Sequence, residues 1–247
     1  MIGRIICGLA LIAATSGVVS AKSSPAAIPK ACPTDGGYDA KSDFGWTCRY
    51  RADNEALLKS GSAVDVVFMG DSITEGWLKG DPVLFSKGRV DRGISGQTTP
   101  QMLLRFRQDV IALHPHSVHI MAGTNDIAGN TGPMTVDDSF RNIRAMAEMA
   151  YSNGIKVVIA SVLPASGFPW RTEKRPATAI AELNMQLRDY AKARGFAFAD
   201  YYSAMAGSDG GLSPALAIDG VHPTTQGYTM MRPIADEAIK SVPSKAR

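Results

Sequence analysis

The sequence predicts one three-layer α/β sandwich built around a parallel sheet of five strands. Two observations favour this fold. Short apolar runs rich in β-branched residues recur along the chain, and amphipathic stretches with helical spacing lie between them. The chain has 247 residues, of which 45% are hydrophobic and 20% charged, so it is long enough to enclose one full-sized core. Such alternation is typical of parallel sheets that carry helices on both faces.

Residues 1–21 are expected to be a secretory signal peptide that is removed from the mature protein. Arg4 supplies the positive start, residues 5–14 the apolar centre, and residues 19–21 a small-residue cleavage site. The alternative is a retained anchor helix, but the apolar run is short for a bilayer span. We therefore expect an exported protein, periplasmic or extracellular, without a stable membrane anchor.

The charge balance argues against nucleic acid as a partner. The chain has a formal net charge of +3, and residues 1–21 contain one arginine and no acid, so 3 − 1 leaves +2 for the remainder. The sequence has no basic stripe with interleaved aromatic residues. Nucleic-acid binding is therefore set aside, and the composition leaves the oligomeric state open.

Residues 22–52 are expected to form a leader and a disulfide-stapled segment ahead of the main domain, residues 53–247. Cys32 and Cys48 are the cysteines that remain after residues 1–21 are removed, and 15 residues separate them. In an oxidising compartment two such cysteines pair, and the disulfide would contribute about 3 kcal/mol in the chain-entropy model. Metal binding by two lone cysteines is the weaker alternative.

The main domain is predicted to alternate strands and helices after a short helix at residues 53–59. Strands are expected at residues 64–69, 89–94, 117–122, 156–162 and 196–200. Later helices are expected to begin at Thr99-Pro100, at a capping box of Thr135 and Asp138, near Ile180, and at Pro223, with a kink at Pro233. The segment lengths fit the right-handed crossovers that parallel sheets require.

The strand at residues 64–69 ends at Gly70-Asp71-Ser72, and this triplet organises the candidate site. Gly70 allows a sharp turn, so Ser72 follows the carboxyl end of a buried strand. Open α/β sheets place their ligands at that edge, where a serine hydroxyl can meet a carbonyl group. The alternative is a turn serine that only caps the next helix.

Asp219 and His222 near the C-terminus could activate such a serine. They stand three apart at the mouth of a predicted helix, so the carboxylate can hold one imidazole nitrogen while the other faces Ser72. Either residue alone would be an ordinary turn or helix-start residue. Together with a serine at a strand end, they indicate nucleophilic catalysis.

Asn125 and Gly93 are candidates for stabilising an oxyanion. Asn125 follows the strand at residues 117–122, and its side-chain amide can donate a hydrogen bond at the sheet edge. Gly93 lies at the end of the strand at residues 89–94, where the lack of a Cβ allows its backbone N–H to approach closely.

Taken in order, four blocks of the sequence resemble the SGNH (GDSL) hydrolase superfamily. The blocks are Gly70-Asp71-Ser72, Gly93, Gly123-Thr124-Asn125-Asp126 and Asp219-Gly220-Val221-His222. The resemblance runs from about Val64 to the C-terminal helix. It implies a flavodoxin-like three-layer fold and serine ester hydrolysis without a metal or another cofactor.

The resemblance also implies a role for each matched residue. Ser72 would be the nucleophile, His222 the base and Asp219 the residue that orients it. The backbone N–H of Ser72, the N–H of Gly93 and the side chain of Asn125 would form the oxyanion hole. Asp91 departs from the family pattern, since many relatives have Asn there, and this puts at most substrate contacts in doubt.

Other motifs are absent or remain ambiguous. Thr74 stands where a Gly-x-Ser-x-Gly motif would need its second glycine, and no GxGxxG sequence supports a nucleotide cofactor.

His114, His116 and His119 are close in sequence, but they straddle Pro115 and no metal site is expected. Three aromatic residues follow strands at the same edge and could wall a substrate pocket or only cover the core: Trp77, Phe168 and Trp170.

The sequence leaves competing functions open. The leading hypothesis is a secreted serine esterase acting on small acyl esters, for example O-acetyl groups on carbohydrate. The alternative among hydrolases is a lysophospholipase or thioesterase acting on longer acyl chains. An inactive carbohydrate-binding module using Trp77 and Trp170 is the alternative from another class, and the Asp219–His222 pair argues against it.

Overall fold

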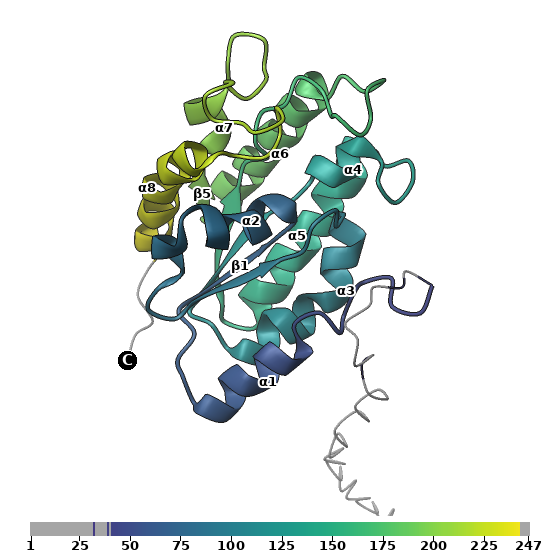
Figure 1. Ribbon diagram of the computed structural model, residues 1–247. Helices are drawn as coiled ribbons and strands as arrows, with labels where there is room; N and C mark the ends of the chain where they lie inside the picture. The colour runs from purple at the N-terminus through teal and green to yellow at the C-terminus, as the bar shows by residue number, and fades with distance from the viewer. Residues whose placement is uncertain (1–31, 33–38, 40, 243–247) are drawn as a thin grey trace, which may run out of the picture.

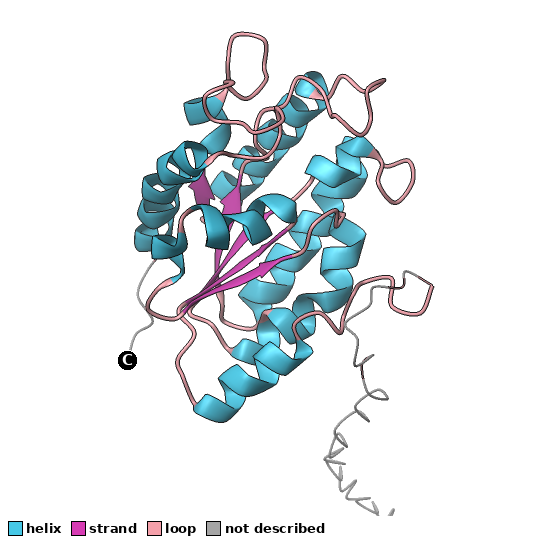
Figure 2. Cartoon of the chain, viewed as in Figure 1, coloured by secondary structure: helices cyan, strands magenta, loops and turns pink. Residues whose placement is uncertain are grey.

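The computed structural model describes residues 32, 39 and 41–242. Five parallel strands form one sheet in the order β2-β1-β3-β4-β5. The strands are β1 (Val66–Gly70), β2 (Arg89–Gly93), β3 (Ser117–Met121), β4 (Lys156–Ala160) and β5 (Ala197–Ala199). Figure 2 shows the sheet between two layers of helices. The predicted α/β class, the five parallel strands and the three layers are confirmed.

Two groups of helices cover the two faces of the sheet (Figure 1). One face carries α1 (Arg51–Ser60), α3 (Thr99–Asp109), α5 (Val136–Ser152) and α6 (Ala177–Arg194). The other carries α2 (Ser72–Gly80) and α8 (Thr225–Ser241), with α7 (Tyr201–Met205) beside α8. Short turns of helix complete the chain: η1 (Pro82–Phe85), η2 (Ile111–Leu113) and α4 (Thr124–Ala128). Because both faces are covered, every residue of β1 and β3 is buried.

The register of the central strands aligns their carboxyl ends. Gly70 of β1 pairs with Gly93 of β2 on one side and with Met121 of β3 on the other. The segments that leave these three strands therefore begin at one edge of the sheet. Ser72 and Asn125 both lie just beyond that edge, as the sequence predicts.

Side-chain caps fix where several helices begin, and the capping residue of α3 and the first residue of α8 differ from expectation. Thr135 and Asp138 form the predicted capping box of α5. In α3 the cap is Thr98 rather than Thr99, because Gln101 three positions on completes a capping box. Helix α8 begins at Thr225 rather than Pro223, because the Thr224 hydroxyl accepts a hydrogen bond from the N–H of Gly227, 3.2 Å away.

The segment before α1 is tied to the domain. Cys32 and Cys48 form a disulfide with their Cα atoms 5.5 Å apart, as predicted. Gln97 donates a 2.8 Å hydrogen bond to the carbonyl of Gly45, and the Tyr50 hydroxyl donates to the carbonyl of Gly93. The expected signal peptide and the first part of the leader lie outside the described residues. No helix in the described part of the chain has the length and apolar character to cross a membrane.

Candidate active site

Ser72, His222 and Asp219 form a continuous hydrogen-bonded chain. The Ser72 Oγ lies 2.9 Å from His222 Nε2, and His222 Nδ1 lies 2.8 Å from Asp219 Oδ2. A carboxylate can only accept, so Nδ1 carries the proton and Nε2 faces the serine as an acceptor. This is the arrangement that a serine nucleophile and its general base require.

The Asp219 carboxylate also organises its own loop. Its Oδ1 atom accepts hydrogen bonds from the backbone N–H groups of Val221 and His222, at 3.0 and 2.9 Å. Burial opposes ionisation of Asp219, but these donors and the His222 ring together hold the pKa of its carboxyl below the usual value. Asp219 is therefore ionised when His222 gains a proton, and the resulting imidazolium is stabilised.

The start of α2 places Ser72. A Cβ on Gly70 would lie 2.0 Å from the Thr74 hydroxyl oxygen and 2.9 Å from the Met121 carbonyl, so the strand end needs glycine. Ser72 is the first residue of α2, so its backbone N–H has no acceptor within the helix. The hydroxyl and the N–H of Ser72, which has no acceptor within the described part of the chain, therefore stand together at the helix N-terminus, where partial positive charge favours an anion.

Asp71 joins the nucleophile to the oxyanion side of the site. Its buried carboxylate caps α2 by accepting from the N–H of Ile73 at 2.9 Å, and it accepts from Asn125 Nδ2 at 3.2 Å. Burial raises the pKa of Asp71 to about 6, although the Ile73 N–H and the nearby His222 favour the charged form. Asn125 Nδ2 also donates to the carbonyl of Gln97, at 3.1 Å. The amide nitrogen of Asn125 is thus aimed at the sheet edge that carries Ser72.

A buried arginine fixes the same edge from within α3. Arg105 has no exposed side-chain surface and pairs with Asp109 at 3.0 Å. Its guanidinium donates to the Gly70 carbonyl at 3.0 Å and to the Gln97 side-chain oxygen at 2.6 Å. Sequence reasoning missed this residue, although a charged side chain on the apolar face between Met102 and Phe106 was a signal that could have found it.

Gly93 has a different surrounding from the one expected. Its backbone N–H donates to Asp91 Oδ1 at 2.7 Å, so this donor is already engaged. A Cβ at this position would lie 2.1 Å from the backbone nitrogen of Glu75, which explains the glycine as a close contact between β2 and α2. Gly96, three residues on, is exposed, and no hydrogen bond among the described residues uses its N–H. The turn at Ser95-Gly96 was the sequence signal for a second candidate donor.

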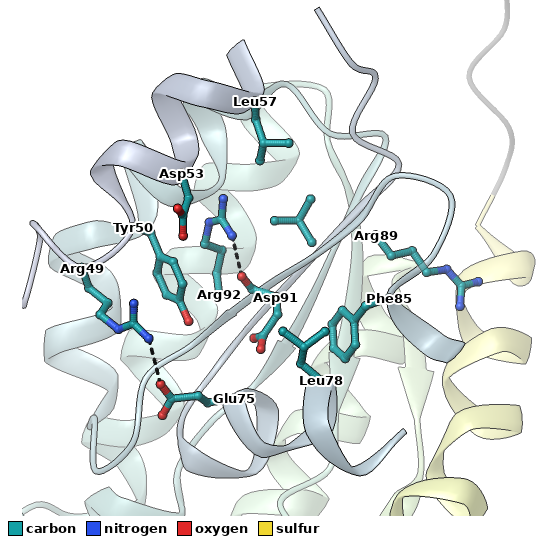
Figure 3. Close-up of a pocket in the computed structure, with 11 residues that line it drawn as sticks. Arg49, Tyr50, Asp53, Leu57, Glu75, Leu78, Phe85, Arg89, Asp91 and Arg92 are labelled. Atoms are coloured by element: carbon teal, nitrogen blue, oxygen red, sulfur yellow. Dashed lines mark hydrogen bonds and ion pairs between the residues drawn. The ribbon is translucent and has the colours of Figure 1, made fainter. Parts of the chain in front are cut away.

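Asp91 of β2 lines a cavity of about 460 Å³. Figure 3 shows its side chain among the other residues that line this cavity. Burial raises the pKa of Asp91 to about 7; the nearby Glu75 charge acts in the same direction, and the Gly93 N–H opposes it. Glu75 also receives hydrogen bonds from Arg49 and from the backbone of Ser95. Glu75 lines this cavity and the cleft beside Ser72, so it separates the two.

The cleft beside Ser72 has a volume of about 600 Å³ and lies between α2 and the start of α8. Charged and hydroxyl side chains share its lining with apolar ones: Ser72, Glu75, Lys79, Ser95, Thr225, Tyr228, Ile218 and Pro223. Tyr228 packs against Gly76 and Gly80 of α2, and its hydroxyl donates to the carbonyl of Ile73 at 2.9 Å. A bound molecule of moderate size therefore has room next to the nucleophile.

The three aromatic candidates separate in the structure. Trp77 is fully buried and stacks on Tyr228, so it belongs to the core and is not placed to contact a substrate. Phe168 is 2% exposed and lies beneath the ring of Trp170, which corrects its assignment in the same way. Trp170 is 39% exposed, and its ring centroid lies 6.0 Å from that of His222. Only Trp170 of the three remains a candidate wall of the site.

The three clustered histidines do not converge. His119 is buried in β3 and hydrogen-bonded to the Tyr201 hydroxyl at 2.8 Å, and its pKa is lowered to about 3 by burial. His116 lies 3.7 Å from Asp65, and His114 ends η2 in a left-handed conformation. Within the described residues, no three His, Cys, Asp or Glu side chains gather as a metal-ligand group.

The chain is similar in sequence and fold to several known proteins. A solved GDSL-like lipase from Bacteroides thetaiotaomicron is 48% identical, with a TM-score of 0.75, covering 80% of this chain and 98% of that one. The acetylxylan esterase Axe2 from Geobacillus stearothermophilus is 22% identical, with a TM-score of 0.59 over 75% of this chain and 98% of its own, and shares the fold. An uncharacterized lipoprotein, YqeF, from Bacillus subtilis is 36% identical over 121 residues, which are 40% of this chain and 49% of that protein.

The match to YqeF therefore spans about half the length of that curated relative. A family model describing GDSL-like lipases and acylhydrolases matches residues 68–230, which include Ser72, Asn125, Asp219 and His222. The chain belongs to the GDSL-like lipase/acylhydrolase family of serine hydrolases.

Proposed function

We propose that this protein is an exported serine esterase that cleaves small acyl esters through an acyl-enzyme at Ser72. The observation that carries the proposal is the hydrogen-bonded chain from Ser72 through His222 to Asp219. His222 takes the Ser72 proton as the hydroxyl attacks the ester carbonyl, and then gives it to the departing alcohol. Water enters by the same route, with His222 as base, and releases the carboxylic acid from Ser72.

The proposed oxyanion hole uses donors from three segments. Among the described residues, the Ser72 N–H at the start of α2 has no acceptor. Both N–H groups of the Asn125 amide are engaged, at 3.1 Å with the Gln97 carbonyl and at 3.2 Å with Asp71, so Asn125 would donate to the oxyanion by giving up one of these contacts. Both contacts lie at the long end of the usual range, whereas the Gly93 contact with Asp91 is 2.7 Å. Gly93 could contribute only if its N–H left Asp91. We therefore assign the third donor to Gly96, which neighbours Gln97 and whose N–H has no acceptor among the described residues.

The lining of the 600 Å³ cleft supports a hydroxyl-rich alcohol as the leaving group. Glu75, Lys79 and Ser95 offer charged and hydroxyl groups there, next to apolar surface from Ile218 and Pro223. A long alkyl chain would have to cover these polar groups, which costs free energy. The fold-level likeness to an acetylxylan esterase points the same way, so O-acetylated carbohydrate is the substrate class we favour.

Export is part of the proposal. The disulfide between Cys32 and Cys48 suits an oxidising compartment, and the signal-peptide pattern in residues 1–21 would direct the chain there. We propose that residues 22–52 are a leader and a disulfide-stapled segment ahead of the catalytic domain, residues 53–247.

Hydrolysis of p-nitrophenyl esters from acetyl to palmitoyl tests the proposal, with the mature protein beside its Ser72→Ala variant. We expect activity confined to short chains and reduced at least about 10⁴-fold in the variant, because the nucleophile is lost. Activity should then extend to acetylated sugars. A preference for long chains would move the function to a lysophospholipase or thioesterase. Equal inactivity of both proteins, with retained carbohydrate binding, would support a binding module.

A further inference from the structure

A second chain of hydrogen bonds runs from the protein surface to the proposed oxyanion hole. Trp170 Nε1 donates to Asn130 Oδ1 at 3.0 Å, and Asn130 Nδ2 donates to Asn125 Oδ1 at 2.7 Å. Asn125 Nδ2 in turn donates to Asp71 Oδ2 and to the carbonyl of Gln97. Asn130 belongs to none of the sequence motifs described above, and catalysis as proposed does not use it.

The fold brings Asn130 next to Asn125. Helix α4 ends at Ala128 and is capped by Gly129, which adopts a left-handed conformation with φ of 76°. The chain then turns back, and the backbone N–H of Asn130 donates to the carbonyl of Asn125 at 3.0 Å. This is the six-to-one hydrogen bond of a helix C-terminus. Side chains five positions apart therefore face each other across one turn.

The series of hydrogen bonds from Trp170 to Asp71 has a defined donor-to-acceptor direction at both ends. An indole N–H can only donate, so Trp170 fixes the oxygen of Asn130 toward itself and the Asn130 nitrogen toward Asn125. At the other end, the Asp71 carboxylate and the Gln97 carbonyl only accept. Both ends therefore impose the same orientation on the Asn125 amide. Its oxygen faces Asn130, and its nitrogen faces the edge that carries Ser72.

The orientation matters because oxygen and nitrogen of a side-chain amide are nearly equal in size. A flipped Asn125 would present its oxygen to the Asp71 carboxylate and to a developing oxyanion, and both contacts would be repulsive. Asn125 is 3% exposed, so water offers little compensation.

We propose that Asn130 is a positioning residue, which holds the Asn125 amide with its nitrogen toward the reacting carbonyl. Trp170 anchors Asn130 and places an exposed aromatic ring beside His222 in the same arrangement. The inference rests on the proposed ester hydrolysis and adds to it a residue that tunes the oxyanion donor without touching the substrate.

Asn130→Asp tests the inference at nearly constant shape. The introduced carboxylate can still accept from Trp170, but it can only accept from Asn125 and so favours the flipped amide. We expect kcat to fall about 10²- to 10³-fold, as when an oxyanion donor is lost, with KM changed less than about threefold. Asn130→Ala removes the bond without forcing a flip, because Asp71 and Gln97 remain, and should cost only about tenfold.

A matched control is Asn153→Asp. Asn153 lies at the end of α5, at the opposite edge of the sheet, and is hydrogen-bonded to the Met149 carbonyl at 2.8 Å. The same exchange of amide for carboxylate there should leave kcat and KM unchanged. Thermal unfolding of each variant shows whether a loss of activity reflects a loss of fold.

Two measurements separate positioning from other effects. If Asn130 acts through Asn125, the double variant Asn125→Ala with Asn130→Asp will have the kcat of Asn125→Ala alone. Asn130 Nδ2 also contacts the Gly96 carbonyl, at 3.4 Å, so a further multiplicative loss would mean that Asn130 acts by a route other than Asn125 and would overturn the inference. The dependence of kcat on pH tests whether the added charge acts directly on His222. Such an effect would move the midpoint of the profile. Loss of the Asn125 orientation would instead lower the plateau of kcat and leave the midpoint in place. A shifted midpoint with an unchanged plateau would also overturn the inference.

Trp170→Phe keeps the ring and removes the donor, so it serves if Asn130→Asp does not fold. We expect kcat to fall several-fold, and the double variant Trp170→Phe with Asn130→Ala to lose no more than Asn130→Ala alone, since both residues act through the same hydrogen bonds. An active wild type with undiminished variants would refute the role of Asn130 and leave the esterase function intact. A wild type inactive on every ester would instead refute the proposed function, and the inference with it.

Discussion

The two sides of Ser72 are built in different ways. On the base side, Asp219 and His222 lie three positions apart on one loop, and their side chains are 35% and 30% exposed. On the oxyanion side, Asp71, Gln97 and Asn125 come from three separate segments and are each at most 3% exposed. We therefore expect substitutions on the base side to change catalysis with little effect on the stability of the fold. Substitutions on the oxyanion side should change catalysis and stability together.

Asp219→Asn should separate chemistry from stability most clearly. An amide retains an oxygen for the Val221 and His222 N–H groups, but it can donate to Nδ1 and favour the wrong imidazole tautomer. We expect kcat to fall about 10⁴-fold, by analogy with the same change in other serine triads. Because the site is partly exposed, the unfolding temperature should change by less than about 2 °C. A large drop in stability together with activity would contradict this view of the base side.

Asn125→Ala should affect both properties. Loss of the amide donor is expected to lower kcat about 10²- to 10³-fold. It also removes the hydrogen bond to the buried Asp71 carboxylate, which should destabilise the fold by about 1–3 kcal/mol. Urea unfolding and ester kinetics on the same preparation measure the two effects. A variant with lost activity and wild-type stability would show that the two sides of Ser72 are alike.

The contrast also explains how much of the site the sequence predicts. Asp219 and His222 are predictable because their relation is local, and Ser72 because a strand end and a glycine mark it. Gly93 was assigned an N–H directed at the substrate, yet that N–H donates to Asp91, because the pairing depends on side-chain geometry that spacing does not contain. The same holds for Arg105, whose partners Gly70 and Gln97 are reached only through the folded sheet.

The aromatic residues give a parallel lesson for the fold. The five strands follow from periodicity, because each strand is a local pattern, and their parallel direction follows from the helices that alternate with them. Trp77 and Trp170 both follow strands at the catalytic edge, and the sequence treats them alike. One is fully buried and the other 39% exposed, because Trp77 lies on the α2 face that meets α8 and Trp170 lies on a loop. Which side chains a distant helix covers is not a local property.

Of the three substitutions, Asp91→Asn is expected to have the smallest effect, and it is the most sensitive test of the difference between the two sides of Ser72. Asp91 lies beside the oxyanion side but has a raised pKa of about 7, so its buried charge is poorly compensated. Because the folded-state pKa lies above the ordinary value of 3.8, protonated Asp91 stabilises the fold. That contribution is fully present below about pH 4 and is lost as pH rises through about 7.

Asparagine keeps an oxygen for the Gly93 N–H and removes the charge. We therefore expect Asp91→Asn to be more stable than the wild type by on the order of 1–3 kcal/mol at pH 8 and nearly equal to it at about pH 4. Urea unfolding at the two pH values measures this, with Asp53→Asn at the exposed rim of the same cavity as the control. Equal gains at both pH values would mean that Asp91 does not titrate in the folded protein. Burial on this side would then be fully compensated, and the difference between the two sides of Ser72 would rest on hydrogen bonding alone.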